Sequence, residues 1–158
     1  LIVMSLEVND RQYRRGVSMI ELVIAAIVMG IMAAVAAPRF AEALQYHRIE
    51  MAAKRLVADL ESVRSLAYTT GTSQTIRFHD KLGKYQIVGV VDPDRPLDPN
   101  YTVDLTDTPY HCTFASVSFS DLTYNGHGLP NSGGKIVIES GGLQRAISVN
   151  ATSGRASY

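Results

Sequence analysis

The sequence predicts an α+β fold, in which one long N-terminal helix precedes a globular domain of antiparallel β-sheet. Residues 17–37 are almost uniformly apolar and long enough to form a membrane-crossing helix. Apolar residues then recur every three or four positions over 39–70, as on one side of an amphipathic helix. From residue 71 onward, short β-branched and aromatic runs follow one another, separated by Gly, Asp, Asn and Pro. The change in the spacing of apolar residues near residue 71 therefore separates a helical part of the chain from a strand-rich part.

Length, charge and cysteine content restrict the class of protein further. The chain has 158 residues, which favours one globular domain. Its 15 Lys and Arg residues balance 15 Asp and Glu residues, so the chain as a whole is not built to coat nucleic acid or an anionic surface. The single cysteine, Cys112, excludes an internal disulfide and a zinc site that needs two thiolates. We expect Cys112 to be a buried small hydrophobic residue.

The apolar segment is predicted to anchor the chain in a membrane. A helix over residues 17–37 spans a hydrocarbon core of about 30 Å, and its only ionisable side chain is Glu21. Arginines concentrate before the segment, at positions 11, 14 and 15, which places the N-terminus in the cytoplasm and the remainder outside. The alternative is a secretory signal peptide that is cleaved after the small residues 33–37.

Glu21 does not fit a simple membrane anchor. A carboxylate within an apolar span costs about 2.5–3.5 kcal/mol even on the lenient insertion scale, so such residues usually have a charged partner. The alternative is that Glu21 lies close enough to the membrane interface to remain solvated. The partner, if there is one, has to be a cation.

The residues that lead into the apolar segment form a specific motif. Residues 14–22 are a basic leader ending in Gly, an apolar residue, Ser, two apolar residues and Glu, before a hydrophobic run. This motif closely resembles the class III signal of type IV pilins and type II secretion pseudopilins. The resemblance implies that residues 1–16 are a leader peptide, that a prepilin peptidase cleaves between Gly16 and Val17, and that it methylates the new amine of Val17.

The same resemblance implies an assembly role for the segment 17–38. The mature chain would be a single-pass protein of the bacterial inner membrane, with its C-terminal domain in the periplasm and other pseudopilins or pilins as its partners in a filament. If apolar helices pack together there, the ammonium group of Val17 is buried, and Glu21 of a neighbour can neutralise it. Pro38 falls where those proteins carry a proline after the first stretch of the helix. We therefore expect Glu21 and Pro38 to serve assembly.

Residues 39–70 are predicted to continue the helix as its amphipathic part, with Gly71 as the C-cap. We expect the helix to be kinked or loosened at Gly30 and Pro38. The predicted buried stripe consists of Ile49, Ala53, Leu56, Leu60, Val63 and Ala67.

Residues 71–158 are predicted to form the β-rich globular domain. A connection over 79–83 is expected to join the first two strands, and 140–143 to make a tight hairpin between the last two. Residues 92–100 are expected to be a surface loop, because three prolines interrupt them. The strands themselves are expected over 75–78, 85–91, 112–119, 135–139 and 145–149.

The C-terminal part carries a second resemblance, which covers the globular domain. Residues 124–130, the predicted hairpin 135–149 and residues 152–155 are together similar to the globular domain of the GspH/FimT minor pseudopilins. The FimT branch, implicated in DNA uptake, carries Gly-Arg-x-Arg near its C-terminus. This chain has Gly-Arg-Ala-Ser at 154–157, so the second Arg is missing.

Nucleic-acid binding is therefore possible but disfavoured. It would depend on Arg155, and Arg145 and Lys135 could join it in one basic patch. The alternative is that these three side chains are scattered over a solvated surface.

No pattern for catalysis, a cofactor or a metal is found. Phosphate-binding, dinucleotide-binding and nucleophile motifs are absent, and the four histidines have no metal-ligand spacing. The aspartates between 92 and 107 leave calcium as an alternative to a solvated loop. We therefore expect a non-enzymatic minor pseudopilin of a type II secretion system. The alternatives are a FimT-like minor pilin that binds DNA for uptake, and a plain single-pass or signal-bearing periplasmic β domain.

Overall fold

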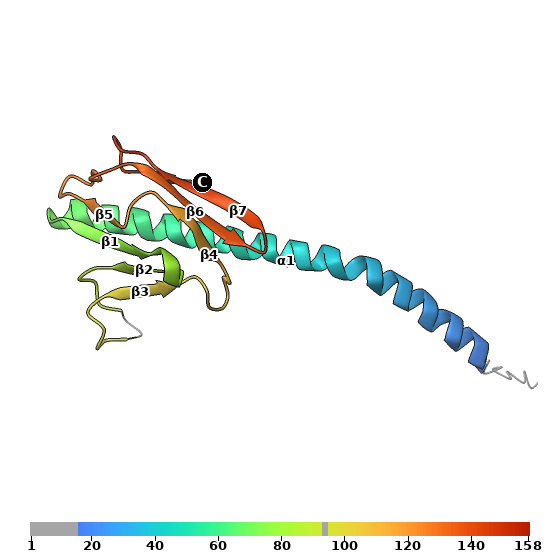
Figure 1. The fold of residues 1–158 in the computed structure, drawn as a ribbon. Helices are drawn as coiled ribbons and strands as arrows, with labels where there is room; N and C mark the ends of the chain where they lie inside the picture. Colours follow the sequence, from blue (N-terminus) through green and yellow to red (C-terminus); the bar gives the residue numbers. More distant parts are fainter. Residues whose placement is uncertain (1–15, 93–94) are drawn as a thin grey trace, which may run out of the picture. The chain divides into compact units, whose positions relative to one another are not determined.

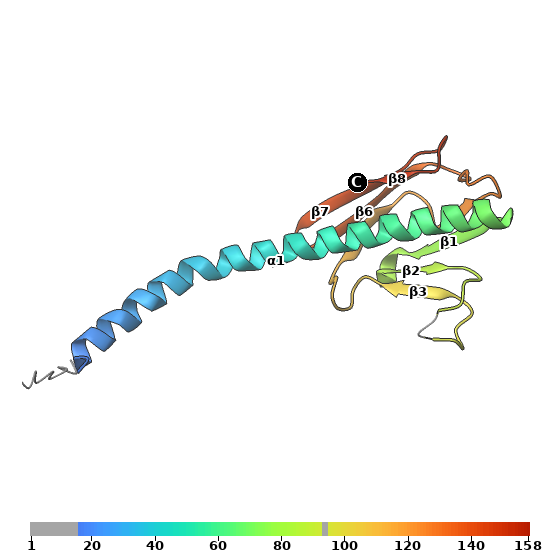
Figure 2. The same cartoon turned by 180° about the vertical axis from the view of Figure 1, so that it is seen from behind.

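The computed structural model describes residues 16–92 and 95–158, so residues 1–15 of the expected leader lie outside the described residues. The elements follow one another as the sequence predicts, with one helix first and strands after it (Figures 1 and 2). They are α1 (Met19–Thr70), β1 (Gln74–His79), the 3₁₀ turn η1 (Asp80–Leu82), β2 (Lys84–Ile87), β3 (Tyr101–Asp104), β4 (Thr113–Val117), β5 (Asp121–Tyr124), β6 (Gly134–Ser140), β7 (Leu143–Val149) and β8 (Ala156–Ser157). The chain divides into two compact units, one up to Arg39 and one from Phe40 to Tyr158.

The helix α1 has 52 residues and passes through Gly30 and Pro38 without interruption, so the expected loosening does not break it. It ends at the predicted C-cap, because Gly71 takes a left-handed backbone angle (φ +66°) that residues with a Cβ rarely adopt. All six residues of the predicted stripe are buried, and Ala52 joins them. The amphipathic half of the helix is therefore confirmed.

In the described part of the chain, the strands form two antiparallel sheets of four strands each. Their orders are β3-β2-β1-β5 and β4-β6-β7-β8. The turn η1 connects β1 to β2, and a two-residue turn connects β6 to β7. Gly141 (φ +56°) and Gly142 (φ +84°) form this second turn, whose left-handed angles suit the twist of a hairpin. Both predicted connections are therefore confirmed.

Five strands match the predicted runs, with different ends. The second run was predicted to reach Val91, but β2 ends at Ile87 because the chain turns at Gly89 (φ +77°). Three strands were not predicted, namely β3, β5 and β8. Each of them has four residues or fewer and mixes polar with apolar residues, so its pattern is too short to be distinctive.

The two sheets contact opposite flanks of the buried stripe of α1. On one flank, the Tyr85 hydroxyl of β2 donates a 2.5 Å hydrogen bond to the buried carboxylate of Asp59. Arg55 donates to the same carboxylate at 3.1 Å and to the Tyr101 hydroxyl of β3. Burial beside Asp59 raises the pKa of Tyr85 well above its ordinary value, so this tyrosine remains a donor. The charge of Asp59 is thus compensated inside the domain.

On the other flank, the helix binds the second sheet. The Glu50 carboxylate accepts a 2.9 Å hydrogen bond from Arg145 of β7. Glu61 lies eleven residues after Glu50, about three helical turns along α1. Its carboxylate accepts a 2.9 Å hydrogen bond from the backbone N–H of Ala156 in β8. The same side of α1 therefore holds both β7 and β8.

Candidate functional site

The N-terminal segment carries the residues predicted for processing and assembly. Gly16 and Val17 lie just before α1 and are exposed. The first helical turn is closed by a 3.1 Å hydrogen bond from the Leu22 N–H to the Ser18 carbonyl oxygen. The peptide bond between Gly16 and Val17 is therefore outside the helix, where a peptidase could reach it.

Glu21 lies in the first turn of α1, four residues after Val17, and is exposed. Within residues 16–92 and 95–158, no basic side chain forms an ion pair with it. The positive end of the helix dipole favours a carboxylate at this position by about 0.3–1 kcal/mol, which is small against the cost of burying the charge. The described part of the chain therefore leaves Glu21 available to a cation of another molecule.

The helix surface beyond Glu21 is apolar and uncovered. Described side chains from Val17 to Ala36 are all exposed, and large ones such as Met19 and Met29 are exposed by 84% and 67%. This part of α1 is long and apolar enough to cross a membrane, with a mean hydropathy of 2.5 over 18 residues. Pro38 lies near the end of this segment, within the helix. Such a surface needs lipid or other helices to cover it.

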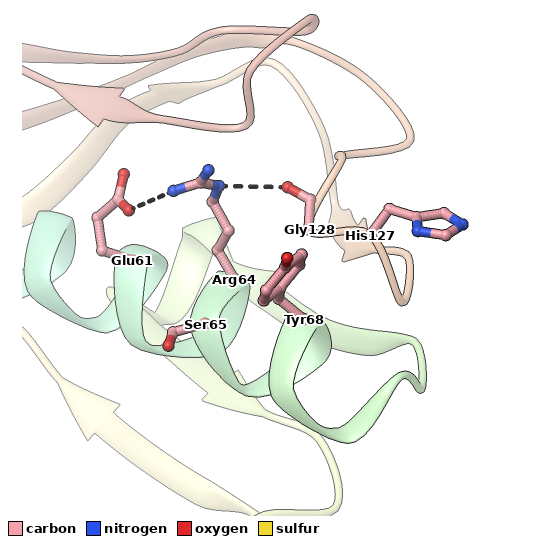
Figure 3. A pocket seen from close by; sticks show the side chains of 6 residues that line it. All are labelled: Glu61, Arg64, Ser65, Tyr68, His127 and Gly128. Atoms are coloured by element: carbon pink, nitrogen blue, oxygen red, sulfur yellow. Dashed lines mark hydrogen bonds and ion pairs between the residues drawn. The ribbon is translucent and has the colours of Figure 1, made fainter.

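A second candidate lies where the end of α1 meets two loops of the globular domain. A hollow of about 360 Å³ is lined by Glu61, Arg64, Ser65 and Tyr68 of the helix and by His127 and Gly128 of the β5–β6 loop (Figure 3). Arg64 lies at its centre and donates to Glu61 at 3.0 Å and to the Gly128 carbonyl oxygen at 3.3 Å. Tyr68 is exposed by 68%. Figure 3 shows the His127 ring pointing away from Arg64.

Two loops, each organised by one asparagine, build this junction. The Asn125 side-chain oxygen accepts the backbone N–H groups of His127 and Leu129, both at 3.0 Å. After β7, the Asn150 side-chain oxygen accepts those of Thr152 and Ser153 at 2.8 and 3.0 Å. These asparagines satisfy the backbone donors that the turns leave unpaired.

Glycines allow the loops to approach each other and the helix. A Cβ on Gly154 would lie 2.5 Å from the Gly128 carbonyl oxygen, and one on Gly126 would lie 2.4 Å from the Gly71 carbonyl oxygen. The buried Tyr124 hydroxyl donates to the Gly154 carbonyl oxygen at 3.3 Å, and burial raises its pKa to about 12. The residues that carried the second resemblance therefore hold this junction together.

The three basic residues proposed for nucleic acid are not all on one face. Lys135 is exposed and pairs with Ser148 across β6 and β7, whereas Arg145 pairs with Ile138, whose side chain is buried. Because facing residues share a side of the sheet, Lys135 and Arg145 lie on opposite sides. Arg145 is also bound to Glu50. Arg155, which precedes β8, is exposed.

The described residues offer little to a metal. Among residues 16–92 and 95–158, no three His, Cys, Asp or Glu side chains are placed to hold an ion, while Asp94 lies outside them. The calcium alternative thus gains no support from the described aspartates. Cys112 is buried, as predicted, and its thiol contacts the Tyr110 carbonyl oxygen at 3.2 Å. Burial raises the pKa of this thiol, which makes it less reactive.

The pairs Glu61–Arg64 and Arg55–Asp59 were not predicted as site residues. Their i,i+3 and i,i+4 spacing could have indicated ion pairs on one helix. Their other partners, Gly128, Ala156 and Tyr85, lie far away in the sequence and come close only through the fold.

Two protein families match the sequence. Residues 52–153, more than half of the chain, match the family described as type II transport protein GspH, and residues 11–37 match the prokaryotic N-terminal methylation motif. No protein with a curated description matches the chain.

Solved structures with a similar fold include two crystal forms of the type IV minor pilin FimU from Pseudomonas aeruginosa. The first has a TM-score of 0.54 and 21% identity, over 71% of this chain and 88% of that chain. The second has a TM-score of 0.52 and 23% identity, over 68% and 90%. The comparisons confirm the predicted pilin-like fold and both predicted resemblances.

Proposed function

The chain belongs to the GspH family of type II transport proteins, and from this premise we propose that it is a minor pseudopilin of a type II secretion pseudopilus. Its role is structural: it enters a filament through its N-terminal helix and has no catalytic activity. The observation that carries the proposal is the exposed apolar surface of residues 17–36, with an unpaired carboxylate in its first turn among the described residues. Both features are explained if neighbouring subunits cover this helix.

Processing supplies a charge partner for Glu21, which has none among the described residues. Cleavage between Gly16 and Val17 frees the amine of Val17, which is methylated in a second step, and the match to the methylation motif over 11–37 supports this processing. When helices pack in a filament, Glu21 of one subunit neutralises the Val17 ammonium of the next. A paired charge is tolerated in apolar surroundings, whereas an unpaired one costs several kcal/mol.

The proposed location is the bacterial inner membrane, with a single crossing and the globular domain in the periplasm. The apolar helix and the prepilin motif support membrane anchoring. The orientation rests on the arginines at 11, 14 and 15, because basic residues favour the cytoplasmic side. The proposed partners are a prepilin peptidase and other pseudopilins or pilins.

The alternative function is that of a type IV pilus minor pilin that captures DNA. The exposed Arg155 next to the junction is the observation in its favour. Against it, Lys135 and Arg145 lie on opposite sides of their sheet. Deleting the gene separates the two functions: loss of protein secretion supports a pseudopilin, and loss of DNA uptake supports the alternative.

Mass spectrometry of the protein from the membrane fraction tests the processing step. We expect a mature chain that begins at methylated Val17, and Gly16→Leu should leave the leader attached. Ala37→Leu is the control, because it alters the competing signal-peptide site and should not affect cleavage after Gly16. A chain that retains the residues before Val17, or one cleaved after Ala37, would overturn the pseudopilin proposal.

A further inference from the structure

Strand β7 has an edge that its own sheet leaves open. It has seven residues, but β8 pairs only with the last two, Ser148 and Val149. The stretch from Leu143 to Ile147 pairs with β6 on one side. On the other side, no strand of the described residues pairs with it. Figure 1 shows β7 at the outer side of β6.

The backbone groups at this edge can be assigned. The Asn150 N–H donates to the Arg155 carbonyl oxygen at 3.0 Å, so the backbone of Asn150 faces the β8 side. Because backbone groups of a strand alternate between its two sides, those of Ser148, Ala146 and Gln144 face the same way. Ser148 is paired with β8. Gln144 and Ala146 therefore each present one N–H donor and one carbonyl acceptor at the open edge.

The edges formed by β3, β4 and β5 are better protected. The outer strand β4 has an irregular register between Phe114 and Ser116, and such a bulge hinders pairing with another chain. The edge of β5 is covered, because Asn131 exchanges hydrogen bonds of 2.8 and 3.1 Å with Thr123. The edge strand β3 has only four residues and ends in the charged Asp104. An unprotected edge is a template for a strand of another chain.

The side chains beside the open edge favour one kind of partner. Arg145 points toward the helix. Its guanidinium carbon lies 5.9 Å from the ring centre of Tyr46 and 5.8 Å from that of Tyr158. Its charge is already compensated by Glu50. The side chains of Tyr46 and Tyr158 remain 51% and 47% exposed. On the helix side of the edge they therefore offer an aromatic surface to an apolar side chain of a partner.

We propose that the open edge of β7 accepts an antiparallel strand from a different pilin-class subunit, an inference that rests on the proposed function. The incoming strand continues the line and direction of β8. It bonds to the backbone of Gln144 and Ala146 and places an apolar side chain against Tyr46 and Tyr158. A second copy of this chain is a poorer partner. Antiparallel pairing of two β7 edges through both free residues would set one Arg145 directly opposite the other.

In-cell photocrosslinking of the full chain tests the partner. A benzophenone amino acid replaces Ala146 at the open edge or, as a control, Ser116 on the bulged strand β4. We expect Ala146 alone to give a crosslink that mass spectrometry assigns to a strand of another pilin-class subunit. Equal crosslinking from Ser116, no crosslink from Ala146, or a crosslink only to a second copy would overturn the inference.

A backbone substitution tests the hydrogen bonds. Ala146→Pro removes the outward N–H and no bond to β6, whereas Ala146→Thr keeps it and serves as the matched control. We expect the proline variant to be processed at Val17 normally but to fall about tenfold in the filament fraction, with the threonine variant unchanged. Wild-type incorporation of the proline variant would contradict the inference. If wild-type protein itself is absent from filaments, the proposed function fails, and crosslinking in the membrane fraction still decides the edge.

Discussion

Glycines allow the close contacts at the junction between the end of α1 and the two loops organised by Asn125 and Asn150. Gly154 has a left-handed backbone (φ +69°), and a Cβ there would lie 2.5 Å from the Gly128 carbonyl oxygen. Gly142 is also left-handed (φ +84°), but a Cβ there would meet nothing within 4 Å. The two positions therefore separate backbone strain from a steric clash.

We predict that Gly154→Ala destabilises the protein more than Gly142→Ala does. The left-handed conformation costs an alanine about 1–2 kcal/mol at either position, and the backbone contact adds to this at Gly154 alone. Urea unfolding of the full chain in detergent measures both free energies of unfolding. Equal losses would show that the loops move apart at little cost.

The buried tyrosines predict how stability changes at high pH. Burial raises the pKa of Tyr85 well above its ordinary value and that of Tyr124 to about 12. Above pH 10 the unfolded chain loses these protons while the folded chain keeps them, so the free energy of unfolding falls as the pH rises. Tyr85→Phe should make this fall shallower between pH 9.5 and 11, because the buried hydroxyl whose pKa is raised is then absent. Unfolding curves at pH 9.5 and at pH 11 provide the measurement. An equal loss of unfolding free energy between these two pH values in Tyr85→Phe and in wild type would contradict the prediction.

At the scale of elements, α1 joins two sheets through polar residues on either flank of its apolar stripe. The stripe could be predicted from the sequence, since its spacing depends only on helical geometry. The flanking bonds could not, because Glu50 and Arg145, for example, are 95 positions apart. Short strands such as β8 were also missed, because two residues carry no period. The junction was indicated only indirectly, by glycines and asparagines whose partners depend on the fold.

The flank bonds lead to a double-mutant prediction. The Glu50–Arg145 pair joins two elements at 2.9 Å and is partly buried, whereas the Glu50–Lys54 pair is an i,i+4 contact at 3.5 Å with an exposed lysine. Double-mutant cycles with alanine should give a coupling free energy of about 1 kcal/mol for Glu50–Arg145 and below about 0.5 kcal/mol for Glu50–Lys54. Thermal or urea unfolding measures both. A larger coupling free energy for Glu50–Lys54 than for Glu50–Arg145 would contradict this prediction.

For the whole molecule, the distribution of charge predicts weak DNA binding. Lys135 and Arg145 lie on opposite sides of their sheet, so at most one of them can share a face with Arg155. Each phosphate contact contributes a salt slope of about −0.9 on duplex DNA, so a face with at most two such contacts binds poorly at physiological salt. Fluorescence anisotropy with the full chain in detergent should show little binding, and Arg155→Ala little change. Low-micromolar binding that Arg155→Ala abolishes would favour the DNA-uptake alternative.

The proposed function requires that the chain enter a filament through its N-terminal helix, with Glu21 as the counter-charge of a neighbour's Val17 amine. The most direct measurement is the amount of chain in sheared filaments from cells expressing wild type, Glu21→Ala or Glu42→Ala. Glu42 is the control, since it is an exposed carboxylate of the same helix outside the apolar segment. We predict normal processing in all three and at least a tenfold loss from filaments for Glu21→Ala alone, because its neighbour's buried amine lacks a partner. Wild-type amounts of Glu21→Ala in filaments would contradict the proposed assembly role of Glu21.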